Sequence, residues 1–370
     1  MPYRVGFAHA AVFTAPGAPL RIERLPIPGL APGDVIVRIR CATICGSDLH
    51  SVMGRRKTLS PAVLGHEMTG EIAEMHPAGA YDLRGNRLSL GDRVTWSMLW
   101  TCGGCYYCSL GLSAHCERLR KFGHEAMGHG MDLFGGFAEY CWLPAGTAIA
   151  RVPENLSDLA AAPANCATAT VAAVVRAAGS LRRANVIVCG AGMLGLTACA
   201  MASWLGARMV IAIEPVGARR EQAGEFGASL LLDPAQGAGD LLSRVAASTS
   251  GRGADIALEF SGSADACESL VALLRPGGHL VMAGSVFPSR PCSFDPEQIV
   301  RRMLRLTGVY NYRPEDLCRG LQFLSETISS FPFSSLVGAT FALGDIDRAI
   351  AFAETAKPPR VALVPGKGSS

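Results

Sequence analysis

Apolar and polar residues alternate in several short stretches of the first 150 residues or so. "DVIVRIRCAT" (34–43) has the period of two that is typical of a half-buried β-strand. "LSLGDRVTW" (88–96) and "GGFAEYCWLP" (135–144) predict two more strands, and Pro/Gly clusters such as "PIPGLAPGD" predict turns. Short strands separated in this way indicate an antiparallel, barrel-like domain.

The pattern changes near residue 155. The Ala-rich stretch 157–179 predicts a helix that ends at Gly179. Short apolar runs then alternate with helical spacers in "NVIVCG", "RMVIAIEP", "ADIALEFSG" and "GGHLVMAGS". This alternation of strand and helix predicts a parallel, doubly wound sheet.

The last part of the chain leaves the sheet pattern. "PEDLCRGLQFLSETI" predicts an amphipathic helix, and "VALVPG" predicts a strand that returns to the first domain. We therefore expect an α/β protein with a split, β-rich domain of residues 1–155 and 313–370 and a nucleotide-binding domain of residues 156–312. A chain of 370 residues is long enough for two such cores.

Composition narrows the class of protein. Apolar residues make up 49%, charged residues 18%, and the net charge is only +3, so we expect a folded chain without a nucleic-acid surface. The N-terminal residues lack a signal-peptide pattern, and no apolar run is long enough to span a bilayer. We expect a cytoplasmic protein without membrane partners. Its 13 cysteines would then stay reduced, and clustered ones favour metal over disulfides.

"CGGCYYCSLGLSAHC" is one such cluster. Its spacing, C-x2-C-x2-C-x7-C, places four thiols in fifteen residues, which suits a closed tetrahedral zinc site. A bacterial ferredoxin run has similar first spacings, but it needs a proline after its last cysteine and usually a second cluster. Structural zinc is therefore the favoured interpretation, with these ligands: Cys102, Cys105, Cys108 and Cys116.

A glycine-rich turn, "CGAGMLG", follows an apolar strand and opens a helix. Gly190 would allow the tight turn, Gly192 the close approach of a pyrophosphate, and Gly195 the packing of helix on strand. The first helical residues, Met193 and Leu194, would offer free N–H groups to the phosphates. The turn predicts a dinucleotide site.

The next strand ends at Glu214, 24 residues after Gly190. A carboxylate at this place binds an adenosine ribose and repels a 2′-phosphate, so the sequence favours NAD over NADP. Arg219 and Arg220 lie just beyond and could hold that phosphate instead.

Several motifs in order resemble the zinc-containing medium-chain alcohol dehydrogenases. They are "CGSDLH" (45–50), "GHE" (65–67), the four-cysteine loop, "NCATAT" (165–170), "CGAGMLG" and Glu214, and together they span almost the whole chain. The resemblance implies a GroES-like catalytic domain, a Rossmann-type domain, NAD, and two Zn²⁺ per subunit. Family members are usually homodimers or homotetramers.

By matching position, the resemblance assigns Cys45, His66 and Cys166 as the ligands of a catalytic zinc. Three protein ligands leave a fourth position open for water or substrate. Glu67 would lie behind the metal as an occasional ligand, and Asp48 would accept the second ring N–H of His66.

The same resemblance gives Ser47 and His50 the task of passing the proton of the alcohol to solvent, while hydride moves to the nicotinamide. Cys41 differs, because it sits within the predicted strand and is expected in the core. "HEAMGH" (124–129) imitates a zinc motif, but its histidines are five residues apart, so we expect a loop on the substrate side.

The substrate side offers two interpretations. A secondary or bulky alcohol would be suited by a set of apolar side chains: Trp96, Met98 and Trp100, with Val286 from the second domain. Some of these side chains could equally lie in the core of the barrel. "MGRRKT" (53–58) places Arg55 and Arg56 near the same region, and Arg binds carboxylate or phosphate. Similarity to a subgroup proposed for phosphonate catabolism makes an anionic hydroxyalkylphosphonate the alternative substrate. Carbonyl reduction is the alternative direction.

Overall fold

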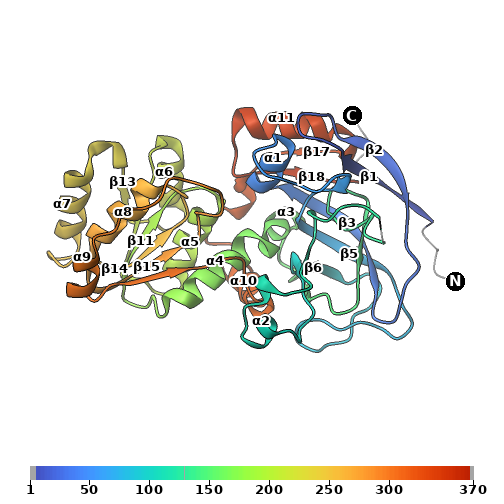
Figure 1. The fold of residues 1–370 in the computed structure, drawn as a ribbon, viewed down its shortest axis with the longest axis horizontal. Helices are drawn as coiled ribbons and strands as arrows, with labels where there is room; N and C mark the ends of the chain where they lie inside the picture. The colour runs from blue at the N-terminus through green and yellow to red at the C-terminus, as the bar shows by residue number, and fades with distance from the viewer. Residues whose placement is uncertain (1–5, 129, 367–370) are drawn as a thin grey trace. The chain divides into compact units, whose positions relative to one another are not determined.

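The computed structural model describes residues 6–128 and 130–366 (Figure 1). The chain forms two compact units. The first comprises residues 1–166, 313–325 and 333–370, and the second comprises residues 167–312 and 326–332. Both units therefore draw on the C-terminal part of the chain.

The first unit is built mainly from β-strands. Among its described residues, the largest sheet has the order β10-β6-β5-β3-β18-β17, with β9 also paired to β3, and smaller sheets have the orders β2-β1-β4 and β7-β8. The strands are β1 (Phe7–Phe13), β2 (Arg21–Pro26), β3 (Val35–Ile44), β4 (Ala62–Val63), β5 (Glu67–Met75), β6 (Arg93–Trp96), β7 (Leu99–Trp100), β8 (Arg120–Lys121), β9 (Tyr140–Leu143), β10 (Ile149–Arg151), β17 (Val337–Phe341) and β18 (Arg360–Leu363).

Short helices connect these strands. They are α1 (Gly46–Val52), α2 (Tyr106–Ser109), η1 (Ser113–His115), α3 (Asp158–Ala161), η2 (Ala162–Asn165), α10 (Pro314–Thr327), η4 (Phe333–Leu336), η5 (Leu343–Asp345) and α11 (Ile346–Ala356). The C-terminal strand β18 pairs antiparallel with β3, so the predicted return of the chain end to the first unit is confirmed.

Strand β3 shows why the sequence pattern identified this sheet. Val37, Ile39 and Cys41 are buried, whereas Arg38 and Arg40, which alternate with them, are exposed. Both arginines reach Glu71 on the neighbouring strand β5, at 3.1 and 3.3 Å. The predicted core position of Cys41 is also confirmed, because its side chain is buried within β3.

The second unit is a parallel sheet with helices. In its described residues, six strands lie in the order β13-β12-β11-β14-β15-β16, and each neighbouring pair is parallel. The strands are β11 (Asn185–Cys189), β12 (Met209–Ile213), β13 (Leu230–Leu232), β14 (Ala254–Glu259), β15 (Leu274–Met282) and β16 (Arg305–Gly308). The helices are α4 (Ala167–Ala178), α5 (Met193–Trp204), α6 (Gly217–Glu225), η3 (Pro234–Gln236), α7 (Ala238–Ser248), α8 (Ala264–Leu273) and α9 (Pro296–Arg301).

The central strands of this sheet are buried on both faces, which explains their uninterrupted apolar runs. Ile187 on β11 packs with Leu241 of α7 and Leu270 of α8 in one hydrophobic core. Its neighbour Val188 points to the opposite face, toward Gly195 of α5. The predicted doubly wound parallel sheet is confirmed.

The prediction of one helix over residues 157–179 is wrong in detail. The Ala-rich stretch 157–179 is not a continuous helix, because it divides into α3, η2 and α4. Pro163 cannot donate an intrahelical hydrogen bond, and Cys166 leaves helical geometry, with φ −125° and ψ −75°. The interruption places Cys166 at the junction, outside both helices.

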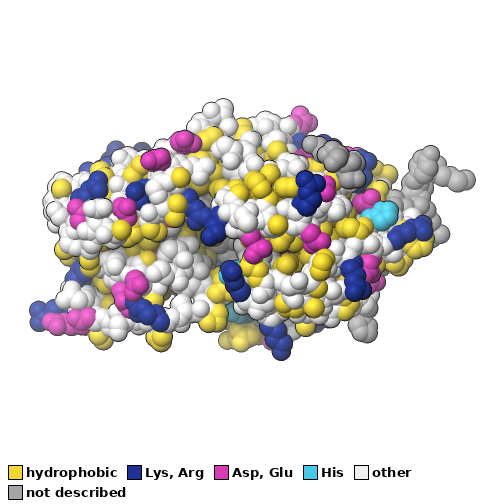
Figure 2. Space-filling model, turned by 90° about the horizontal axis from the view of Figure 1, so that it is seen from above, with side chains coloured by type: hydrophobic (Ala, Val, Ile, Leu, Met, Phe, Trp, Pro, Cys, Tyr) yellow, Lys and Arg dark blue, Asp and Glu magenta, His cyan; other side chains and the backbone are white. Residues whose placement is uncertain are grey.

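Two features of the described residues bear on the environment of the chain. Among them, no single helix has the length and apolar composition to cross a membrane, and one bent pair, Asp158–Asn165 with Ala167–Ala178, passes that test. On the face that Figure 2 shows, basic and acidic side chains of the described residues are interspersed, without an extended area of one sign.

Candidate active site

The pairing of β3 with β5 brings two predicted metal ligands together. Thr43 lies opposite Glu67 in this antiparallel pair. Cys45, two residues beyond Thr43, therefore lies beside His66, which precedes Glu67. Cys166 joins them from the interruption between η2 and α4, so three distant segments meet in one place.

The ligand atoms of these side chains form a compact set. One atom each from Cys45, His66, Glu67 and Cys166 lies within 4.8 Å of every other. The hydrogen bond with Cys166 is the main cause that lowers the pKa of Cys45 well below its usual value, while the same bond raises that of Cys166. The pair thus favours one thiolate before any cation binds.

Asp48 connects two of these ligands. One carboxylate oxygen accepts from the backbone N–H of Cys45 at 2.9 Å, and the other lies 3.2 Å from Nδ1 of His66. Burial alone would lower the pKa of His66, but the charge of Asp48 and the contacts with Asp48 and Cys45 raise it to about 10. The contact with the Asp48 carboxylate, which can only accept, assigns a proton to Nδ1, and Nε2 is the nitrogen that would bind a metal in place of its own proton.

Glu67 is held by a residue that the sequence did not predict. Arg360 donates to both carboxylate oxygens of Glu67 at 2.6 Å, and Thr43 donates to one of them at 2.6 Å. Arg360 also lies 3.6 Å from Sγ of Cys45. Burial raises the pKa of Glu67, and the charge of Arg360 opposes that rise.

Pairing in the sheet explains how Arg360 reaches the site. Val361 lies opposite Ile44 in the β18–β3 pair, which places Arg360 level with Cys45. Because Arg360 neutralises Glu67, the two cysteines are the groups whose charge a metal would have to balance once both are deprotonated. One divalent cation would balance their two thiolates.

Ser47 and His50 lie on α1, directly after Cys45. Oγ of Ser47 is 3.4 Å from Nε2 of His66. His50 follows three residues later and so shares the helix face of Ser47. Burial, and then the charge of Arg55, lowers the pKa of His50, which keeps its ring neutral and able to accept a proton.

The four cysteines of the loop also converge. The sulfur atoms of Cys102, Cys105, Cys108 and Cys116 lie within 4.8 Å of one another. Backbone N–H groups point at the sulfurs, as in the contact of 3.3 Å from Cys102 N to Cys116 Sγ. Such bonds, first from Gly104, lower the pKa of Cys102 to about 6. The four residues form a separate, all-sulfur site suited to a tetrahedral metal.

In the second unit, the glycine turn lies between β11 and α5. Gly190 has φ +92°, a conformation that favours glycine, and a Cβ on Gly195 would lie 1.7 Å from the carbonyl oxygen of Gly190. A Cβ on Gly192 would meet no atom within 4 Å. Gly192 therefore borders open space at the start of α5, where Met193 and Leu194 form the first turn.

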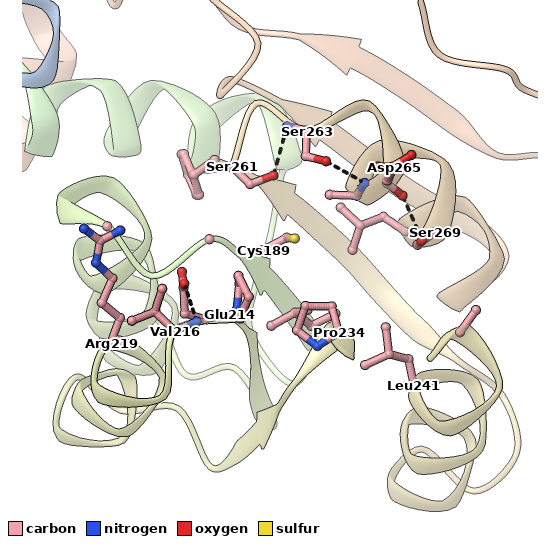
Figure 3. Close-up of a pocket in the computed structure, with 18 residues that line it drawn as sticks. Cys189, Glu214, Val216, Arg219, Pro234, Leu241, Ser261, Ser263, Asp265 and Ser269 are labelled. Atoms are coloured by element: carbon pink, nitrogen blue, oxygen red, sulfur yellow. Dashed lines mark hydrogen bonds between the residues drawn. The ribbon is translucent and has the colours of Figure 1, made fainter. Parts of the chain in front are cut away.

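A cavity of about 590 Å³ adjoins this turn (Figure 3). Glu214 and Arg219 line it. The carboxylate of Glu214 accepts from the backbone N–H groups of Ala191, at 2.6 Å, and Val216, at 3.0 Å. Arg220 points elsewhere, because it binds the Glu214 carbonyl at 2.6 Å and Asp233 at 3.2 Å.

The predicted substrate side chains lie in different surroundings. Trp96 is fully buried in the core of the first unit, with its ring at 6.1 Å from that of Phe122, and Met98 is also buried. Trp100 donates from Nε1 to the Ala145 carbonyl at 2.9 Å. Val286, in the second unit, is exposed. A contact of any of them with substrate stays a prediction.

Arg56 and His124 lie in the first unit close to His66. Nη1 of Arg56 is 2.8 Å from Nε2 of His124, and the rings of His124 and His66 are 5.1 Å apart. The expectation of a loop is confirmed for His124, because it lies outside the helices and strands. His129, the second histidine of "HEAMGH", lies outside the described residues.

The family model of the alcohol dehydrogenase GroES-like domain matches residues 31–154, and that of zinc-binding dehydrogenase matches residues 194–326. L-threonine 3-dehydrogenase from Pyrococcus horikoshii is 31% identical over 307 residues, which cover 81% of this chain and 82% of that protein. The chain belongs to the zinc-containing medium-chain alcohol dehydrogenase family.

Solved structures agree with this assignment. An alcohol dehydrogenase from Thermotoga maritima matches with a TM-score of 0.91 and 28% identity, covering 97% of this chain and 99% of its own. A protein from Sinorhizobium meliloti 1021, described as a zinc-binding dehydrogenase bound to NADP, matches with a TM-score of 0.84 and 25% identity, covering 97% and 99%. The predicted fold class, a GroES-like domain with a Rossmann domain, is confirmed.

This dehydrogenase is an oxidoreductase of the alcohol and threonine dehydrogenase type, which acts on CH–OH groups. Its residues fit the metal of the family, since thiol sulfur and imidazole nitrogen are the donors that zinc prefers. The sequence did not predict two residues of the site, Arg360 and Asn165. Arg360 binds Glu67, and Nδ2 of Asn165 donates to the carbonyls of His66 at 3.0 Å and of Trp96 at 2.9 Å. Because these contacts join segments that are far apart in the sequence, no local pattern indicates them.

Proposed function

We propose that this chain is an NAD-dependent, zinc-dependent dehydrogenase that oxidises a secondary or bulky alcohol to a ketone or aldehyde. The observation that carries the proposal is the buried set of Cys45, His66 and Cys166, with Asp48 fixing the imidazole. Such a set holds a cation by three protein ligands and leaves one position for a small molecule. That the chain forms a homodimer or homotetramer stays a prediction.

Two zinc ions per chain are part of the proposal. The four-cysteine site would hold a structural zinc, since its sulfurs fill all four positions. Cys45, His66 and Cys166 would hold the second, which when bound supplies a Lewis acid that acidifies the substrate hydroxyl. Glu67, bound on both oxygens by Arg360, would stay beside this site.

The residues around the second site would handle the proton. Ser47, 3.4 Å from His66 Nε2, is placed to accept the hydroxyl proton of the substrate as it passes on its own. His50 lies on the same face of α1 and would relay that proton outward. Asp48 keeps Nδ1 of His66 protonated, and Nε2 would be taken by the metal, so the ring would have no free lone pair for the proton.

We also propose that NAD is preferred to NADP. The carboxylate of Glu214 has accepting capacity left after its two backbone contacts, and ribose hydroxyls can use it. A 2′-phosphate there would meet a like charge. Arg219 on the cavity wall opposes this preference, whereas Arg220 is engaged with Asp233.

A cofactor comparison tests the proposal. The zinc-loaded protein is offered a panel of secondary and bulky alcohols with NAD or NADP, and formation of the reduced nicotinamide is followed by absorbance. We expect turnover with kcat/KM at least about tenfold higher for NAD, because like charges oppose the 2′-phosphate. Arg219→Ala should reduce the use of NADP more than that of NAD. Preference for NADP, or no turnover with any alcohol, would contradict the proposal.

A further inference from the structure

His124 makes two hydrogen bonds that define its protonation. Nδ1 lies 2.9 Å from the carbonyl oxygen of Phe122, which can only accept, so Nδ1 carries a proton. Nε2 lies 2.8 Å from Nη1 of Arg56, which can only donate. Nε2 must therefore offer its lone pair, and the ring is the neutral Nδ1–H tautomer. His124 orients Arg56 without neutralising its charge.

Arg56 is fixed at both ends. Its backbone N–H donates to the carbonyl of His50 at 3.1 Å, at the end of α1. Thr58 holds the same loop through Oγ1 contacts with Ser51, at 2.8 Å, and with the Arg56 carbonyl, at 3.4 Å. The guanidinium is thus anchored by its backbone on one side and by His124 on the other.

This guanidinium has no anionic partner of its own. Among the residues that the structure describes, no Asp or Glu oxygen lies within 4.0 Å of its nitrogens. The side chain is half-buried, so solvent compensates its charge only in part. A fixed, partly desolvated guanidinium with N–H groups to spare is a site for an oxyanion, which it can bind through two parallel hydrogen bonds.

His124 and Arg56 lie close to the site of the proposed reaction. The ring of His124 lies 5.1 Å from that of His66, centroid to centroid. Arg56 is therefore one ring away from a proposed metal ligand, on the same unit of the chain. An anion on Arg56 would therefore lie in the same part of the first unit as the proposed metal ligands.

We propose that His124 is a positioning residue that holds Arg56 to bind an anionic group, a carboxylate or a phosphonate, of the alcohol substrate. The inference rests on the proposed dehydrogenase function and narrows its substrate to an alcohol that carries an oxyanion. A neutral imidazole suits this task, because a carboxylate in its place would cancel the charge that the substrate needs.

Three alcohols test the substrate class: 3-hydroxybutyrate, 2-hydroxypropylphosphonate and neutral 2-butanol. We expect a higher kcat/KM for at least one anionic alcohol than for 2-butanol, and the better of the two identifies carboxylate or phosphonate as the group. Arg56→Gln should lower the ratio of anionic to neutral kcat/KM by about 10- to 100-fold, mainly through KM, since a hydrogen bond to a charged group is lost.

Variants of His124 separate positioning from structure. His124→Ala should lower the same ratio by about tenfold, again through KM. His124→Gln should restore much of it, because the longer amide can place its oxygen where Nε2 lies and accept from Arg56. The matched control is Lys57→Gln, which removes an exposed neighbouring charge and should leave the ratio unchanged. If His124→Ala impairs anionic and neutral alcohols equally, the role is structural and the inference is wrong.

A binding measurement keeps the inference separate from the proposed function. Calorimetry with methylphosphonate and with acetate on the zinc-loaded protein requires no turnover. At least one anion should bind, and Arg56→Gln should weaken it about tenfold or more. If wild type oxidises neither these three alcohols nor any alcohol of the wider panel, the proposed function fails, while this measurement still decides the anion site. Equal binding by wild type and Arg56→Gln would overturn the inference.

Discussion

At the scale of single residues, the ion pair of Glu67 and Arg360 is the most demanding feature of the site. Glu67 is fully buried and Arg360 nearly so. Removing two charges from water is costly, and the three hydrogen bonds to the carboxylate offset much of that cost. The pair helps to hold Cys45 and His66 in place, because Glu67 is the residue after His66 and Arg360 contacts the sulfur of Cys45.

Removing the positive charge of Arg360 while Glu67 remains should therefore destabilise the protein. We expect Arg360→Leu to lower the free energy of unfolding of the zinc-loaded protein by about 3–5 kcal/mol, because it leaves Glu67 buried and uncompensated. Urea denaturation followed by fluorescence measures the change. Arg301→Ala, which breaks an exposed pair with Glu297, is the control and should change stability by about 0.5 kcal/mol or less. If both variants lower the free energy of unfolding by similar amounts, the buried Glu67–Arg360 pair is no more important for stability than an exposed ion pair.

Single residues also differ in how far their part in the site could be predicted from the sequence. Asp48 lies three residues from Cys45, so its part in the site could be expected from a local motif. Arg360 stands 293 residues from Glu67, and a single arginine at the start of a strand gives no sign of its partner. Arg56 could be predicted as an anion binder from its charge, but its contact with His124 depends on the fold.

At the scale of elements, the strand–turn–helix unit of β11 and α5 divides its glycines by task. Gly195 is required by packing, since its Cα faces the carbonyl of Gly190. Gly192 borders open space and has an ordinary φ of −78°, so nothing in the fold of the chain itself demands glycine there. The open space is what a bound pyrophosphate would need.

Two alanine variants separate these tasks. Gly195→Ala should destabilise the second unit by about 1–3 kcal/mol or more, because its Cβ would overlap the Gly190 carbonyl. Gly192→Ala should leave thermal unfolding unchanged and raise the dissociation constant of NADH about tenfold or more, since the backbone can no longer approach the phosphates. Thermal unfolding and NADH fluorescence titration measure the two effects. Tight NADH binding by a stable Gly192→Ala protein would argue against the assigned site.

The elements predicted best were those whose signal is local. The β11 run, its glycine turn and α5 follow one another within twenty residues, and all were expected. The interruption at Cys166 was not, although Pro163 is a local sign of it. Asn165 stabilises the interruption through the carbonyls of His66 and Trp96, which lie 99 and 69 residues away.

At the scale of the whole molecule, the described residues form two candidate metal sites of different construction. The four-cysteine site comes from one loop of fifteen residues, so its sequence spacing alone predicts it. The site of Cys45, His66 and Cys166 exists only after β3, β5 and the η2–α4 junction have come together. From the sequence, a resemblance to known dehydrogenases was needed to assemble it.

The zinc content and the NAD-linked activity of Cys45→Ala test the central claim most directly. Wild type should contain two zinc ions per chain by elemental analysis and form NADH from an alcohol substrate. Cys45→Ala should retain one zinc ion, in the four-cysteine site, and lose NADH formation by a factor of about a hundred or more, because the Lewis acid is absent. A Cys45→Ala protein that keeps two zinc ions, or that forms NADH at the wild-type rate, would contradict the account.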